Sequence, residues 1–357
     1  MDMLTPAGAT IASWIVLDKK EEETEFPSAG RHSSSREFQL IYWRCALVCF
    51  GTSVRQNPNA HHVIFSNVDI AAHAPAEVVD RLRSWDVELV TLEFKHRLPL
   101  GSVQRWGNVF YELDILRYVH EQQWPGLILL DIDCVWIRPS SEIEAALNQK
   151  DILAYTLNPE DQKNYEGDVL INGMSRKAMR ADIEPRLGRA MDRDPYIYGG
   201  EFFAVTAAAC GLLVRDTEAL WNQVLAKLHL QDSMKTEEHL LSILFEVNGA
   251  EPHSGNRFVR RMWTHFEDFN VKPSDLMLTI WHLPAEKRFG FRTLYSELLD
   301  PRSQFWTGTP EEAVAVIRRH MGVPRKSPIK FSRDLLQRLA DRVQQRLPIR
   351  QLLAAMQ

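Results

Sequence analysis

The sequence has few cysteines and no long apolar run, and each shortage excludes a class of protein. No apolar stretch approaches the roughly 18 to 20 residues that cross a bilayer. The N-terminus, Met1–Met3, has no basic segment, so we expect no signal peptide. Four cysteines in 357 residues, without metal or redox spacing, exclude a disulfide scaffold and favour reduced core thiols in a cytoplasmic protein. These cysteines are Cys45, Cys49, Cys134 and Cys210.

The chain as a whole also has no large excess of positive or negative charge. It carries 42 Lys and Arg against 47 Asp and Glu, a net charge of −5, which does not fit a nucleic-acid-binding surface. Hydrophobic residues make up 45% of the chain, with 16 Phe, 10 Trp and 8 Tyr, so a large core can form and disorder is excluded. The length suits about two domains, or one large α/β domain with additions.

Hydrophobic periodicity predicts alternating strands and helices. β-rich or continuous apolar runs predict strands at 9–17, 62–65, 87–94, 126–130, 152–157, 202–205 and 276–281. Helical spacing predicts helices at 42–56, 75–85, 103–122, 216–230 and 236–247, and polar stretches at 19–36 and 95–104 predict loops. This alternation favours an α/β fold with a Rossmann-like, mostly parallel sheet covered by helices on both faces. Such sheets bind ligands beyond the carboxyl ends of their strands.

The strongest chemical signal is LILLDIDCVWIRP at 127–139, in which Asp131 and Asp133 follow a buried strand. Two carboxylates this close repel each other unless a cation compensates them, and a divalent ion is the usual compensation. The run resembles the Asp-x-Asp motif of nucleotide-sugar glycosyltransferases with the GT-A fold. The resemblance implies that Asp133 binds Mn²⁺ or Mg²⁺ directly. It also implies that Asp131 contacts the ribose of the donor, or contacts the ion through water.

A second motif precedes the first. In ELDILR, Asp114 and Arg117 lie three residues apart and share a helix face. The pair is similar to the Asp-x-x-Arg of bacterial toxin glucosyltransferases and related mannosyltransferases, which implies a grip on donor-sugar hydroxyls. An ordinary salt bridge on a helix face is the open alternative.

Two further motifs follow, YGGEFF at 198–203 and TEEHL at 236–240. Their order after Asp-x-Asp resembles the blood-group galactosyl- and N-acetylgalactosaminyltransferases. That likeness places Gly199, Gly200 and Glu201 at the donor sugar. It places Glu237 beside the anomeric carbon, with Glu238 as the second catalytic candidate. The alternatives are a glycine turn before a strand, and acids that favour a helix N-terminus.

Late in the chain, WHLPAEKR resembles the His-x-x-Gly-x-x-Lys of glycogenin-like transferases. The resemblance implies that His282 is a third metal ligand and that Lys287 or Arg288 binds the diphosphate. The fit is incomplete, because Ala285 replaces the glycine and Lys287 comes one position early. His265 is the rival of His282.

The motifs together predict a metal-dependent hexosyltransferase. It would move sugar from a nucleotide diphosphate donor to a hydroxyl acceptor on a glycan, a lipid-linked molecule or a small molecule, with retention favoured. One alternative is a haloacid-dehalogenase-like phosphatase with Asp131 as nucleophile. That motif usually follows the first strand, and here three predicted strands precede it. A nucleotidyltransferase would need a glycine-rich loop after the first strand, which DKKEEETEF is not. A non-enzymatic carbohydrate-binding protein would not need the buried aspartates.

The composition changes near residue 310, so we expect a catalytic domain over 1–310 and a basic helical tail over 311–357. Residues 318–350 hold ten Lys and Arg against two Asp, a net charge of +8. Leucines and a valine recur at steps of three and four, and arginines recur at steps of four on a neighbouring face. We expect this helix either to make a peripheral contact with the inner membrane or to dock on the catalytic domain. The apolar positions are Leu335, Leu336, Leu339, Val343 and Leu347, and the basic ones are Arg338, Arg342, Arg346 and Arg350.

Overall fold

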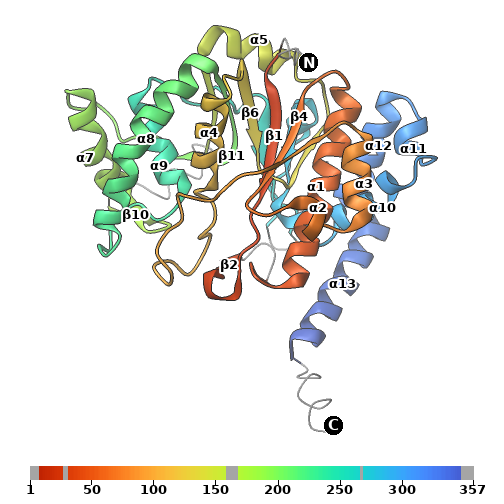
Figure 1. Cartoon of the computed structure of the whole chain (residues 1–357). Helices are drawn as coiled ribbons and strands as arrows, with labels where there is room; N and C mark the ends of the chain where they lie inside the picture. The colour runs from red at the N-terminus through yellow and green to blue at the C-terminus, as the bar shows by residue number, and fades with distance from the viewer. Residues whose placement is uncertain (1–7, 27–30, 158–167, 266–267, 347–357) are drawn as a thin grey trace.

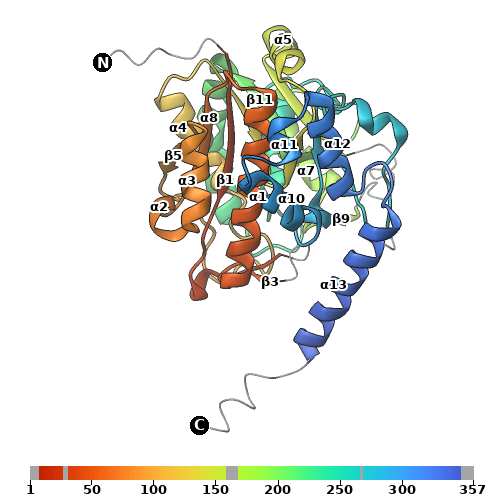
Figure 2. The ribbon, with the colours of Figure 1, turned by 90° about the vertical axis from the view of Figure 1, so that its right-hand side faces the viewer.

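The computed structural model describes residues 8–26, 31–157, 168–265 and 268–346, and the side chains at 31 and 340–346 are not among those described. A central sheet lies between two layers of helices, as Figure 1 and Figure 2 show. In the described chain this sheet has six strands in the order β5–β4–β1–β6–β11–β8. They are β1 (Thr10–Ile15), β4 (His62–Ser66), β5 (Glu88–Thr91), β6 (Gly126–Leu130), β8 (Ile152–Thr156) and β11 (Tyr198–Thr206). The predicted α/β class is confirmed.

Five of the six strands run in the same direction, and only β11 is reversed among these described strands. β4 pairs in parallel with β5 and β1, and β1 with β6, whereas β11 runs antiparallel to both β6 and β8. All five residues of β6 are buried, as expected for a continuous apolar strand with helices on both faces. The turn that follows β6 therefore lies near the middle of the sheet edge.

Each face of the sheet has its own apolar core. One core joins the sheet to α4 (Tyr111–Glu121), α5 (Ser141–Lys150), α7 (Arg176–Leu187), α8 (Ala207–Lys227) and α9 (Glu237–Val247). The other joins it to α1 (Arg36–Gln56), α3 (Ala76–Ser84), α10 (Gly290–Leu299), α11 (Gln304–Thr307) and α12 (Pro310–Met321). Helix α2 (Ile70–His73) precedes α3. The four cysteines are buried and free.

Three small sheets complete the fold of the residues that the structure describes. β12 (Val259–Arg261), β13 (Ile280–His282) and β7 (Cys134–Trp136) form one of them. The other two are the pairs β2 (Glu25–Phe26) with β3 (Arg31–His32), and β9 (Leu170–Ile171) with β10 (Met174–Ser175). The first small sheet matters most here, because it brings β13 beside the residues that follow β6.

Several predicted boundaries are wrong for local reasons. The helix expected from 103 begins at Tyr111, since Trp106 has a φ of 53° and Arg105 bridges to Glu25. The helix expected from 42 begins at Arg36, where the Ser35 hydroxyl accepts a hydrogen bond from the Phe38 amide at 3.2 Å. The 19–36 segment, expected to be a loop, also contains a 3₁₀ turn and strands β2 and β3.

Later elements also differ from the expected ones. α8 starts at Ala207 rather than 216, because the Thr206 hydroxyl caps it. The strand expected at 202–205 is the longer β11, and the strand expected from 276 is only β13, which follows a 3₁₀ turn at Pro273–Met277. Leu347 and Arg350 of the predicted tail lie outside the described residues.

The chain ends in α12 and α13 (Pro328–Arg346). Ala313, Val316 and Ile317 of α12 are buried in the second core, while α13 extends away from the body (Figure 2). The domain boundary at residue 310 stays a prediction. Among the described residues, no helix is both long enough and apolar enough to span a membrane.

Candidate active site

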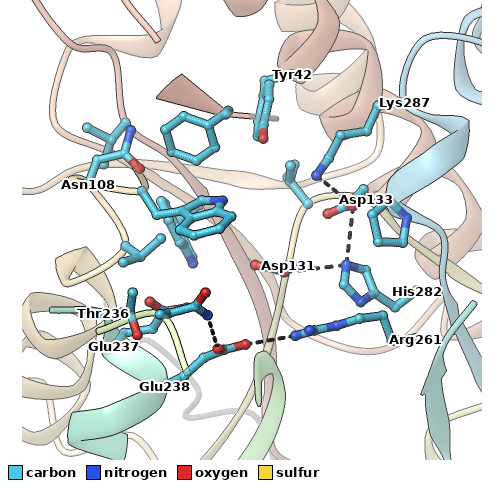
Figure 3. Close-up of a pocket in the computed structure, with 18 of the residues that line it drawn as sticks. Tyr42, Asn108, Asp131, Asp133, Thr236, Glu237, Glu238, Arg261, His282 and Lys287 are labelled. Carbon is cyan, nitrogen blue, oxygen red and sulfur yellow. Dashed lines mark hydrogen bonds and ion pairs between the residues drawn. The ribbon is translucent and has the colours of Figure 1, made fainter. Parts of the chain in front are cut away.

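A pocket of about 610 Å³ opens where β1 and β6 end, and Figure 3 shows the side chains that line it. Trp14 and Val16 come from the end of β1, Asp131 and Asp133 follow β6, and Glu237 begins α9. The volume falls within the range of small-molecule and cofactor sites in proteins. The position agrees with the predicted carboxyl edge of a parallel sheet.

Asp131, Asp133 and His282 come together in this pocket, as the sequence predicted. Each residue can offer one ligand atom so that all three atoms lie within 4.8 Å of one another. The His282 Nε2 atom is 3.4 Å from Asp131 Oδ2 and 3.2 Å from Asp133 Oδ2. The side chains of Asp133 and His282 are almost fully buried, whereas Asp131 is 34% exposed and faces the pocket.

The small sheet explains this convergence. β13 runs antiparallel to β7, and His282 stands opposite Cys134 in the register. Because Cys134 directly follows Asp133, the imidazole at the end of β13 is brought to the aspartate pair. The Asp131 amide donates to the carbonyl of Glu201 at 3.1 Å, which ties the turn to β11.

Positive charge balances the two carboxylates. Lys287 Nζ lies 2.7 Å from Asp133 Oδ2, and its ammonium is 5.2 Å from the centre of the Tyr42 ring. Burial alone would raise the pKa of Asp133, but Lys287 and His282 lower it well below its usual value. Burial alone would lower the pKa of His282, but Asp133 and Glu201 raise it to about 9. Two carboxylates and one imidazole are a donor set that suits a divalent ion, which would replace the imidazole proton.

Glu201 lies behind the metal-ligand candidates rather than in the pocket lining. Its two carboxylate oxygens accept hydrogen bonds from Arg261 at 2.7 Å each, and Oε1 is 3.4 Å from Nδ1 of His282. Burial would raise the pKa of Glu201, yet Arg261 and His282 lower it to about 2. Glu201 can therefore orient the imidazole. Its predicted contact with a donor sugar stays a prediction.

Arg261 joins Glu201 to the predicted catalytic residue Glu238. Its Nη2 atom is 2.9 Å from Glu238 Oε1, and Asn172 donates to Glu238 Oε2 at 3.2 Å. Arg261 was missed in the sequence because an isolated arginine in a short strand gives no motif. Its pairing with two acids far away in the chain follows only from the fold.

Glu237 faces a carboxylate that the sequence analysis did not identify, Glu112 of α4. A Cβ on Gly200 would lie 2.9 Å from Glu237 Oε1 and 3.4 Å from Glu112 Oε2, so Gly200 allows both carboxylates to approach β11. Glu112 is buried and accepts a hydrogen bond from Trp14 Nε1 at 3.2 Å. Burial and Glu237 raise the pKa of Glu112, while burial and Glu238 raise that of Glu237. The sequence offered one indication of Glu112, namely that it lies two positions before Asp114 in the same motif.

The glycine pair lies within β11 and not in a turn before it. A Cβ on Gly199 would lie within bonding distance of the Glu201 carboxylate, so a side chain here would displace that residue. Because neither glycine has a side chain, neighbouring carboxylates can lie close to the backbone at both positions. Their predicted approach to a sugar stays a prediction.

The structure places Asp114 and Arg117 outside the pocket lining. Arg117 donates to Asp114 at 2.9 Å, and the same carboxylate accepts the backbone amides of Lys95 and His96 at 2.9 and 3.1 Å. The pair thus orders the start of the 95–104 loop. The predicted contact of Asp114 and Arg117 with donor-sugar hydroxyls stays a prediction.

The remaining predicted site residues differ in whether they line the pocket. His265 lines the pocket and stacks on Trp263, with ring centres 5.6 Å apart, but it does not belong to the metal-ligand cluster found among the described residues. Arg288 is not among the residues that line the pocket, whereas Lys287 is. The diphosphate role predicted for either residue stays a prediction.

Methionine in place of Arg261 should destabilise the fold by about 3 to 5 kcal/mol, because it leaves the carboxylates of Glu201 and Glu238 buried without their cation. Urea unfolding followed by circular dichroism measures this. Arg180→Met is the control, since its pair with Glu184 is about one third exposed and should contribute less than about 1 kcal/mol. Equal losses in the two variants would contradict the buried network.

No protein-family model matches the chain, and no curated protein matches it. Similar solved structures are glycosyltransferases by name. The galactosyltransferase LgtC, solved with donor and acceptor sugar analogues, is 12% identical with a TM-score of 0.48, over 86% of this chain and 99% of LgtC. Mouse xyloside xylosyltransferase 1 is 12% identical with a TM-score of 0.43, over 77% of this chain and 97% of the other.

A third similar structure is the bifunctional glycosyltransferase WbbM, which is 10% identical with a TM-score of 0.46. The match covers 79% of this chain but only 46% of WbbM, so the chain spans about half of that protein. TM-scores below 0.5 indicate a loose likeness of the backbone, and a function must be argued from the site.

Proposed function

We propose that the chain is a metal-dependent glycosyltransferase that moves a hexose from a nucleotide diphosphate sugar to a hydroxyl acceptor. The observation that carries the proposal is the convergence of Asp131, Asp133 and His282, from two separate sheets, in one pocket with Lys287. Mn²⁺ or Mg²⁺, when bound there, would neutralise charge on the leaving diphosphate. Lys287 supports the same role, because its buried ammonium adds positive charge beside the ion site.

Glu237 is the residue best placed to act on the sugar. It lines the pocket at the start of α9, and Figure 3 shows it across the pocket from Lys287. A sugar between these two residues would have its diphosphate near the metal site and its anomeric carbon near the Glu237 carboxylate. That arrangement supports a role in stabilising positive charge at the anomeric carbon. Retention of configuration is favoured because the families that the motifs resemble retain it. Glu238, held by Arg261, is the positioning neighbour.

A panel of nucleotide sugars, tested by thermal shift and by donor hydrolysis, examines this function directly. We expect at least one nucleotide diphosphate sugar to raise Tm in the presence of Mn²⁺, and to be slowly hydrolysed. Mn²⁺ should support the reaction at least as well as Mg²⁺, because a site of mixed oxygen and imidazole ligands suits Mn²⁺ better.

Two controls separate the alternatives. Excess chelator should stop donor hydrolysis, and activity that survives it in full would contradict the metal site. A chromogenic phosphomonoester should remain intact. Its cleavage, without cleavage of any sugar nucleotide, would instead favour a phosphatase in which Asp131 is the nucleophile.

A further inference from the structure

Helix α13 presents an apolar face to solvent. Figure 2 shows the helix leaving the body of the molecule. Ile329 is 81% exposed and Leu336 is 67% exposed, fractions that exclude packing of these side chains on the catalytic domain. Phe331, Leu335 and Leu339 are also exposed. Five large apolar side chains within eleven residues form a patch of the kind that marks an interaction surface.

The opposite face of α13 is fixed to the body by buried charges. Lys330 Nζ lies 2.6 Å from Glu286 Oε2 and 2.8 Å from Asp334 Oδ2. Lys326 Nζ lies 2.8 Å from Asp334 Oδ2 and 3.3 Å from Glu286 Oε1. Lys330, Asp334 and Glu286 are each at most 2% exposed. This cluster determines which face of the helix is turned outward.

Helix geometry places the apolar residues on that outer face. Leu339 follows Lys330 by nine residues, about two and a half turns, so the two point to opposite sides. Viewed along the helix axis, Leu335 and Leu336 lie on either side of Leu339, each within about 60° of it. The outer face is thus a continuous stripe, and it is not covered by any described part of the chain.

The positive charge on and around α13 favours an anionic partner. Arg333 of α13 and Arg325, three residues before the helix, are exposed, and residues 318–350 carry a net charge of +8. Among the described side chains of α13, the only carboxylate is that of Asp334, which is buried. A second copy that packed its own α13 here would bring like charge to this face, whereas an anionic lipid surface attracts the basic side chains.

We propose that α13 docks on an anionic lipid bilayer, with its apolar stripe at the acyl boundary and its basic side chains among the headgroups. The nineteen residues of the helix span about 28 Å. In Figure 1 the free end of α13 and strand β2, which follows the carboxyl end of β1, lie on the same side of the molecule. This docking rests on α13 alone and does not depend on the proposed transferase function.

Vesicle flotation tests the docking without any donor or acceptor. The full chain should float with vesicles of phosphatidylcholine and phosphatidylglycerol, should not float with phosphatidylcholine alone, and should be released by high salt. The double variant Leu336→Glu/Leu339→Glu should stay at the bottom of the gradient. Arg325→Gln and Arg333→Gln should each lower the partition coefficient about fivefold.

A matched variant and two further measurements decide the outcome. Leu212→Glu changes a leucine that is 42% exposed on α8, and it should float like the unchanged chain. Donor hydrolysis should be equal in all these variants, because none of the residues lines the pocket. Failure to float with anionic vesicles would overturn the proposal. So would a dimer, seen by light scattering, that the double leucine variant dissociates. Neither result depends on sugar transfer, so the two proposals can fail separately.

Discussion

Asparagine in place of Asp133 should reduce donor turnover about a thousandfold. The change keeps the size of the side chain but removes the buried carboxylate that lies between His282 and Lys287. Loss of metal-ion stabilisation costs several kcal/mol in the transition state, which corresponds to about three orders of magnitude in rate. The measurement is kcat for hydrolysis of the donor found in the panel, at saturating Mn²⁺ and corrected for the folded fraction.

The control for this variant is Asp182→Asn. Asp182 is also a buried carboxylate with a lysine partner, Lys227, at 2.7 Å, but it lies on α7 outside the pocket lining. It should lose stability without losing turnover per folded molecule. If Asp133→Asn keeps more than a few per cent of the turnover, Asp133 is not a metal ligand.

The second large effect is expected at Glu237. Glu237→Gln should lower kcat by about two to four orders of magnitude while changing donor affinity little, because the carboxylate acts on charge that develops in the transition state. Steady-state kinetics, together with calorimetric donor binding, separates kcat from affinity.

Glu238→Gln is the matched neighbour. Glu238 accepts hydrogen bonds from Arg261 and Asn172, so its replacement should change stability and donor affinity more than kcat. An unchanged kcat in Glu237→Gln would return that residue to the role of an acid at a helix N-terminus. A larger kcat loss in Glu238→Gln would move the catalytic role to Glu238.

The centre of the site could be predicted from the sequence because its signals are local. An apolar run that ends at Asp131 identifies a buried strand and the sheet edge that follows it. His282 stands at the end of its strand, and Lys287 follows five residues later. What could not be predicted is the pairing of β13 with β7, which brings His282 to the aspartates. Strand pairing between segments so far apart leaves no pattern in either segment.

The residues that surround the centre were missed for the same reason. Arg261 has partners 60 and 23 residues away in the chain, and Glu112 meets Glu237 only across Gly200 of β11. Helix starts were missed where a single hydroxyl decides them, as Ser35 does for α1. The reversed direction of β11 could not be predicted either, because a buried strand has the same apolar pattern in a parallel and in an antiparallel pair.

The tail illustrates a choice that periodicity leaves open. The spacing of Leu335, Leu336 and Leu339 indicates a stripe but not whether the stripe is buried. The ion pairs of Lys330 with Glu286 and Asp334 determine this, because they turn the leucines away from the body.

The measurement that tests the metal site most directly is anomalous diffraction from crystals grown with Mn²⁺ and a nucleoside diphosphate. We predict one strong anomalous peak, bounded by the carboxylates of Asp131 and Asp133 and by Nε2 of His282, with diphosphate oxygens beside it on the pocket side. The same peak should be missing in crystals of Asp133→Asn. A peak elsewhere in the pocket, or bound diphosphate with no peak among these three side chains, would contradict the assignment.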